Sequence, residues 1–106
     1  MIFTGSPSIT THPSSQLITS NMTVTLDCEG TGEEPITYQW ENSNINGGKW
    51  MDIDNSNSKR LVVKNVEQSE QYRCVVSNDA GQTESDIATI TVLSKCAMWS
   101  INSFVM

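Results

Sequence analysis

The segment Met22-Thr23-Val24-Thr25-Leu26-Asp27-Cys28 decides the fold of this chain. Apolar and polar residues alternate along it, so that Val24, Leu26 and Cys28 share one face. A period of two is typical of a β-strand with one buried face, because successive side chains of a strand point to opposite sides. The same alternation predicts four further strands, at residues 36–41, 61–66, 72–77 and 88–92.

Turn-forming residues separate these predicted strands. Glycine, proline, asparagine, aspartate and serine are concentrated between the strands, at residues 29–35, 42–48, 54–58 and 78–81. No helical periodicity of useful length interrupts the series. The spacing therefore predicts an all-β fold, built as an antiparallel sandwich or barrel.

Three further elements are predicted at the margins of the sheets. Residues 7–13 are expected to form an edge strand, because proline cannot donate a hydrogen bond to a neighbouring strand. Pro13 is expected to end this strand, so that the chain resumes at residues 16–19 against a different neighbour. Residues 49–53 are expected to lie along a sheet edge.

The joint spacing of four residues points to a known family. Cys28 and Cys74 lie 46 positions apart, Trp40 follows the first cysteine by 12, and Tyr72 precedes the second by two. On these residues the chain resembles an immunoglobulin domain, most like the I-set or C2-like members found in adhesion molecules and surface receptors. The matching motifs are Leu26-Asp27-Cys28, Tyr38-Gln39-Trp40, Leu61-Val62-Val63-Lys64-Asn65-Val66, Tyr72-Arg73-Cys74 and Asn78-Asp79-Ala80-Gly81.

This resemblance covers residues 7–93 and implies a two-sheet antiparallel Greek-key sandwich, with an N-terminal extension at 1–6 and a C-terminal tail at 94–106. It implies a disulfide between Cys28 and Cys74, which would contribute about 4 kcal/mol in the chain-entropy model. It also implies that the hydroxyl of Tyr72 bonds back to the chain just upstream. The implied core residues are Trp40, Tyr72, Leu26 and Leu61.

The chain departs from the family pattern in two places. Members usually carry Asp-x-Gly-x-Tyr-x-Cys, whereas this chain has Gln68-Ser69-Glu70-Gln71-Tyr72-Arg73-Cys74. Both the aspartate and the glycine are missing, so we expect a looser corner but the same fold. In addition, only 20 residues separate Trp40 from Leu61, too few for the extra strand pair of a variable-type domain.

Composition excludes two classes of partner. The net charge is −6 and the isoelectric point is near 4.5. A chain this acidic gains nothing from counterion release on nucleic acid or on anionic lipid, so neither is expected as a partner. No run approaches the roughly 18 apolar residues of a membrane span. The start of the chain also lacks the basic and apolar regions of a signal peptide, so secretion would require a leader outside this sequence.

Catalysis is not expected, because the sequence lacks the residues that chemistry requires. His12 is the single histidine, no nucleophile motif or phosphate-binding loop occurs, and no cofactor or metal is expected. Glu29, Glu33 and Glu34 are interpreted as solubilising charge, because they lack the regular oxygen spacing of a calcium loop.

Two positions bear on covalent modification. Asn21-Met22-Thr23 is the only N-x-Thr sequon, and its place at the start of a predicted strand would let a glycan project from Asn21. Cys96 is left over if Cys28 and Cys74 pair. It is either a free thiol in the apolar tail or a cross-link to another chain.

A protein partner is the remaining expectation, with its identity open, whether self or other. The outward positions of the sheet that carries the second cysteine are Gln39, Glu41, Arg73, Val75 and Ser77. They either form a docking face, with Arg73 as a donor and Val75 as an exposed apolar residue, or a solvated face that touches nothing specific. Trp50 is expected to pack on its own domain.

Two functions remain open from the sequence. The favoured hypothesis is an extracellular module, secreted or on a cell surface, that mediates protein–protein recognition or adhesion. The alternative is an intracellular structural or spacer domain of a muscle or scaffold protein, in which the two cysteines stay reduced.

Overall fold

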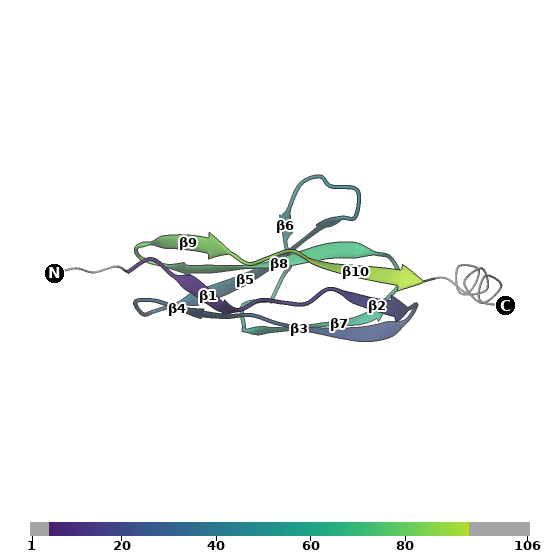
Figure 1. Ribbon diagram of the computed structural model, residues 1–106, viewed down its shortest axis with the longest axis horizontal. Coiled ribbons are helices and arrows are strands. Elements are labelled where there is room, and N and C mark those ends of the chain that lie inside the picture. The colour runs from purple at the N-terminus through teal and green to yellow at the C-terminus, as the bar shows by residue number, and fades with distance from the viewer. Residues whose placement is uncertain (1–4, 94–106) are drawn as a thin grey trace.

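The computed structural model describes residues 5–93, and all of the regular structure in this range is β-strand (Figure 1). The all-β prediction is therefore confirmed. The strands are, in chain order, β1 (Ser8–Thr11), β2 (Gln16–Thr19), β3 (Met22–Asp27), β4 (Glu29–Thr31), β5 (Thr37–Asn44), β6 (Met51–Asp52), β7 (Arg60–Val66), β8 (Glu70–Asn78), β9 (Gly81–Glu84) and β10 (Ala88–Leu93).

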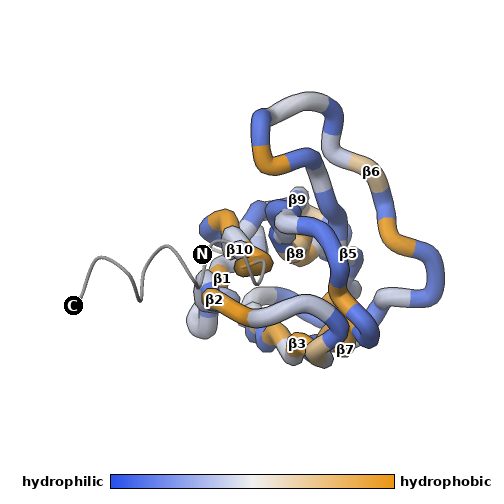
Figure 2. The backbone as a smooth tube through the Cα atoms, turned by 90° about the vertical axis from the view of Figure 1, so that its right-hand side faces the viewer, coloured by the Kyte–Doolittle hydropathy of each residue, from blue (hydrophilic) through white to orange (hydrophobic). Residues whose placement is uncertain are grey.

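The strands form two facing layers, which makes the fold a sandwich (Figures 1 and 2). One layer has the order β2-β10-β8-β5-β6, and β9 pairs with β8 beyond the end of β10. The other layer contains the pairs β3-β7 and β1-β4. Cys28 alone separates β3 from β4, so one continuous run of chain serves both pairs.

Pro13 divides the first strand between the two layers, as the sequence predicts. β1 pairs with β4 in one layer, whereas β2 pairs with β10 in the other. The β2–β10 ladder is parallel, and it is the one exception to antiparallel pairing among the described strands. The chain crosses between layers at the buried Pro13 without reversing its direction, so β2 joins β10 in parallel.

Two strands lie where the sequence predicts turns. β4 falls in the predicted turn at 29–35, and β9 begins at the end of the predicted turn at 78–81. Backbone pairing holds both strands in place. β4 pairs with β1, which is distant in sequence, and β9 pairs with β8 across a hairpin. β6 is shorter than the predicted 49–53, because only Met51 and Asp52 pair with β5.

The core lies between the layers and is centred on Trp40, which is fully buried. The disulfide between Cys28 and Cys74 joins the two layers beside it, with 6.4 Å between the Cα atoms. The indole Nε1 of Trp40 donates a hydrogen bond to the Ser58 carbonyl at 2.9 Å, so its polar atom is satisfied inside the core. Leu26, Leu61 and Tyr72 are also buried and belong to the same apolar cluster.

At the N-terminal end, the part of the predicted extension that the structure describes is attached to the domain. Gly5 is buried, and its carbonyl accepts a hydrogen bond from the side chain of Asn78. The same amide group donates to the Glu33 carbonyl at 2.9 Å. Asn78 therefore joins the entering chain to two loops. The predicted tail, at 94–106, lies outside the described residues.

Candidate functional site

The structure brings the five predicted partner-binding residues together on the outer face of β5 and β8, with β9 alongside. Glu41 lies opposite Arg73 in the ladder, and Gln39 lies opposite Val75. Ser77 follows two positions further along β8. Because Trp40 and Cys74 point into the core, their neighbours Gln39, Glu41, Arg73 and Val75 point out. We call this surface the β5–β8 outer face.

Arg73 is held on this face by two carboxylates. Its Nε lies 2.7 Å from Glu41 Oε1, and its Nη1 lies 3.7 Å from Glu84 Oε1. The Arg73 and Glu41 side chains are only 20% and 17% exposed, so this ion pair is screened less than an ordinary surface pair. The sequence missed Glu84, because β9 falls next to a predicted turn and its pairing with Val75 is set only by the hairpin.

Trp50 covers the Arg73 guanidinium from the loop that precedes β6. The guanidinium carbon lies 4.4 Å from the ring centroid, which is cation–π geometry. Trp50 therefore packs on its own domain, as expected, and restricts the rotamers of Arg73. The resulting cluster of one cation, two carboxylates and an indole is preorganised before any partner arrives.

Gln39 is held by the chain that follows β6. Its Nε2 donates to the Ile53 carbonyl at 3.0 Å and to Ser56 Oγ at 3.2 Å. Asn57 Nδ2 donates in turn to Gln39 Oε1 at 3.0 Å. Gln39 therefore anchors the segment that leads from one layer to the other.

Val75 corrects one expectation. The sequence predicts an exposed apolar residue at this position, but the residue is only 7% exposed. The reason is β9, because Val75 lies opposite Gln39 on one side and opposite Glu84 on the other. The position is thus in the interior of a three-strand surface, and the exposed part of the β5–β8 outer face is polar and charged.

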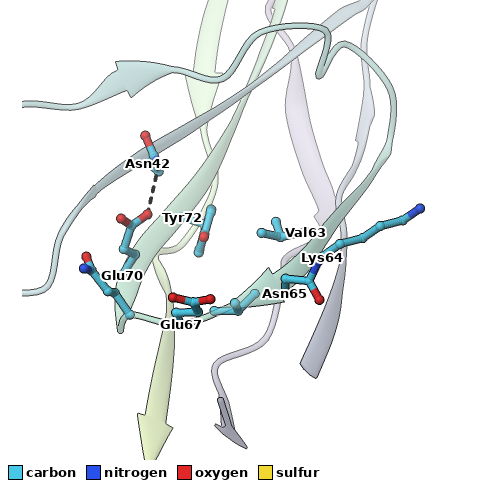
Figure 3. A pocket seen from close by; sticks show the side chains of 9 residues that line it. Asn42, Val63, Lys64, Asn65, Glu67, Glu70 and Tyr72 are labelled. Atoms are coloured by element: carbon cyan, nitrogen blue, oxygen red, sulfur yellow. Dashed lines mark hydrogen bonds between the residues drawn. The ribbon is translucent and has the colours of Figure 1, made fainter. Parts of the chain in front are cut away.

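A hollow of ≈ 390 Å³ lies where β7 leads into β8, and residues of both strands and Asn42 of β5 line it (Figure 3). Asn42 Nδ2 donates a hydrogen bond to Glu70 Oε1 at 3.0 Å inside it. Burial, together with the charge of Glu70 and a hydrogen bond to it, raises the pKa of Tyr72 to about 12. Tyr72 and Glu70 both line this hollow. Within the described chain no hydrogen bond joins the Tyr72 hydroxyl to a backbone atom, so the bond to the upstream chain that the resemblance implies is not found.

His12 and Glu29, two titratable residues considered in the sequence, each contact another part of the chain. His12 Nδ1 accepts a hydrogen bond from the Asp86 amide at 3.0 Å, which fixes the crossing between β1 and β2 against the link between β9 and β10. Glu29 is paired with Lys59 at 3.3 Å. Across residues 5–93, no three His, Cys, Asp or Glu side chains are grouped so that they could hold a metal ion.

Asn21 lies in the turn between β2 and β3, and it is exposed. Its φ of 70° is a left-handed conformation that asparagine tolerates, and its backbone amide donates a hydrogen bond to the Val66 carbonyl at 2.8 Å. The backbone is therefore fixed while the side chain faces solvent. Cys96 lies outside the described residues. Within the part of the chain that is described, no helix is long and apolar enough to cross a bilayer.

Comparison with known proteins agrees with this architecture. Residues 6–78 match the family model described as "Immunoglobulin domain". The chain is 31% identical over 93 residues to HEPACAM family member 2 of Mus musculus, covering 81% of this chain and 19% of that protein. It is 32% identical over 85 residues to Hemicentin-1 of Mus musculus, covering 72% of this chain and 1% of that protein. The chain thus spans only a small part of either relative.

Solved structures share the fold. The tandem Ig repeats of Dlar match with a TM-score of 0.71 at 23% identity, over 86% of this chain and 48% of that one. An I-band fragment of titin matches with a TM-score of 0.67 at 24% identity, over 83% of this chain and 32% of that one. At these identities the likeness concerns the fold alone.

Proposed function

This chain belongs to the immunoglobulin domain family, and we propose that it is an extracellular recognition or adhesion module that binds another protein through the β5–β8 outer face. The family consists of non-enzymatic binding and adhesion modules, so its members act by surface complementarity.

The observation that carries the proposal is the fixed position of Arg73. Arginine and tryptophan are the residues most enriched at the energetic centres of interfaces. Here Trp50 lies on Arg73, and Glu41 and Glu84 hold the guanidinium from two sides. A partner that binds this cluster loses little side-chain entropy, because the rotamers are already fixed in the free protein.

Two features support an extracellular location. The Cys28–Cys74 disulfide is a bond that persists in oxidising compartments and is rare in the cytosol. The sequon at Asn21 is exposed in the turn between β2 and β3. This turn lies at the end of the sandwich away from β4 and β9 (Figure 1), so a glycan there would leave the β5–β8 outer face uncovered.

The compartment is tested by expressing the chain behind a leader in a secretory host. We expect a glycan mass that Asn21→Gln removes and that Asn46→Gln, a change at an exposed asparagine outside any sequon, leaves in place. We also expect both Cys28 and Cys74 to resist alkylation until the protein is reduced. An unglycosylated protein that keeps its full stability with Cys28→Ala and Cys74→Ala combined would favour an intracellular spacer domain instead.

The docking face is tested with a panel of purified extracellular domains, this chain included, each immobilised and probed with the soluble protein. We expect at least one specific interaction, weakened about tenfold or more by Arg73→Ala, since interface arginines are common hot spots. Lys49→Ala is the control, because it removes one positive charge at an exposed position of the β5–β6 loop, outside the five residues that define this face. Equal weakening by both variants, with melting temperatures unchanged, would contradict the proposal.

A further inference from the structure

The outer edge of β7 is an unpaired strand edge. β7 (Arg60–Val66) pairs with β3 on one side, and no other strand in residues 5–93 pairs with it. The reason is the short connection from β6, which crosses directly from one layer to the other and adds no strand before β7. Figure 2 shows β7 beside β3 at the margin of its layer. This edge therefore presents backbone groups that a further strand could use.

The register identifies which backbone groups face outward. The Cys28 amide donates to the Lys59 carbonyl at 2.8 Å, and Leu26 lies opposite Leu61. In an antiparallel ladder, alternate residues direct both backbone groups to the same neighbour. The alternation holds as far as Val63, because the register shifts between Val63 and Val66. Lys59 and Leu61 thus direct their backbone groups to β3, whereas Arg60 and Val62 direct theirs away from it. Among these, the Arg60 carbonyl already accepts a hydrogen bond from Ser58 Oγ.

The side chains along this edge are basic around one apolar residue. Val62 is 48% exposed, and Arg60 and Lys64 flank it at two positions on either side. Lys59, Arg60 and Lys64 are half of the six basic residues of a chain whose net charge is −6. Arg60 and Lys59 pair with Asp27 and Glu29, but both pairs are at least half exposed and therefore weak enough to exchange partners.

These charges select among possible occupants of the edge. A second copy of the chain, paired antiparallel about Val62, would place Arg60 opposite Lys64 twice, and like charges directly opposite destabilise a strand pair. A strand with an acidic residue two positions before and two positions after a β-branched residue would instead place opposite charges across from Arg60 and Lys64, which stabilises a strand pair. We infer that the β7 edge binds an extended acidic segment of another protein by strand addition, with carboxylates opposite Arg60 and Lys64.

The inference is tested with an acetylated and amidated peptide, Thr-Glu-Thr-Val-Thr-Glu-Thr, added to the oxidised chain while amide hydrogen exchange is followed by NMR. In the free protein the Arg60 and Val62 amides should exchange faster than those of Leu61 and Val63. Saturating peptide should slow exchange at Val62 at least about tenfold, because strand addition protects this amide. This measurement needs no variant.

Two pairs of variants separate strand addition from general attraction of an acidic peptide. Lys64→Glu should weaken binding about tenfold or more, since it places like charges opposite each other, whereas Lys49→Glu changes the charge equally in the β5–β6 loop and should have less than about a twofold effect. Val62→Pro removes an outward amide and should abolish binding, whereas Val62→Thr should retain it.

Three results would overturn the inference. They are equal weakening by Lys64→Glu and Lys49→Glu, unchanged exchange at Val62 at saturating peptide, and a dimer of the chain alone that Val62→Pro dissociates. The last result would assign the edge to a second copy. None of these results bears on the β5–β8 outer face, which lies on the other layer.

Discussion

Ser85 bridges both backbone groups of Cys74. Its amide donates to the Cys74 carbonyl at 2.8 Å, and its Oγ accepts a hydrogen bond from the Cys74 amide at 2.9 Å. This contact lies where the chain passes from β9 to β10, so the side chain replaces a strand at a break in the pairing beside β8. Ser85, which is itself only 7% exposed, thereby supplies hydrogen-bond partners for the buried backbone amide and carbonyl of the disulfide-bonded Cys74.

Ser85→Ala should destabilise the domain by about 1–3 kcal/mol, because it leaves the buried Cys74 amide without an acceptor. Urea unfolding followed by tryptophan fluorescence measures the loss. Ser20→Ala is the control, since Ser20 is exposed in the turn between β2 and β3 and should change stability by less than about 0.5 kcal/mol. Equal stability of the two variants would show that water replaces the serine hydroxyl.

Trp40→Ala should cost about 3–5 kcal/mol by creating a cavity beside the disulfide. A loss of this size is comparable to the net stability of many small domains, so much of the protein should be unfolded. Trp50→Ala serves as the comparison, because it removes an indole from the surface and should cost about 1 kcal/mol or less. A Trp40→Ala protein with an unshifted melting temperature would place the core elsewhere.

Gly30→Ala should destabilise the contact between the layers by about 1–3 kcal/mol through overpacking. A Cβ at this position would lie 2.7 Å from Val76 Cγ1, and 3.2 Å from the Ser8 carbonyl oxygen. Val76→Ala removes the first of these obstacles. In a double-mutant cycle, the two changes together should therefore cost less than the sum of their separate effects. Strict additivity would mean that Val76 is not the limiting contact.

Alkaline pH should destabilise the fold through Tyr72. Its folded pKa is raised from 10.0 to about 12, chiefly by burial and secondarily by Glu70. Below about pH 10 the Tyr72 hydroxyl keeps its proton in both the folded and the unfolded state. Between about pH 10 and 12 the unfolded state releases this proton first, so the free energy of unfolding falls as pH rises.

Tyr72→Phe should remove this part of the alkaline loss. Tyrosinate absorbance measured during a pH titration of both proteins isolates the Tyr72 contribution as their difference. A midpoint near the ordinary value for tyrosine, in protein that circular dichroism shows to be folded, would contradict the assignment.

Much of the core was predictable because its signals are local or depend on a single spacing. Val24 and Leu26 alternate with threonines in one strand, and Cys28, Trp40 and Cys74 occupy inward positions at separations that a two-layer sandwich requires. The candidate site was only partly predictable. Arg73 and Glu41 could be placed on one face by counting, but Glu84 could not, because β9 depends on a hairpin whose residues lack apolar alternation.

The sequence by itself determined that this chain is a β-sandwich of the immunoglobulin type. Strand periodicity depends on neighbouring residues, and the cysteine–tryptophan spacing can be counted along the chain. Only the tertiary structure decided that β2 pairs in parallel with β10, that Val75 is covered and that the β7 edge is open. These features depend on which backbone groups meet across the sheets. A backbone amide is the same chemical group in nearly every residue, so its partner is set by the packing of the whole domain.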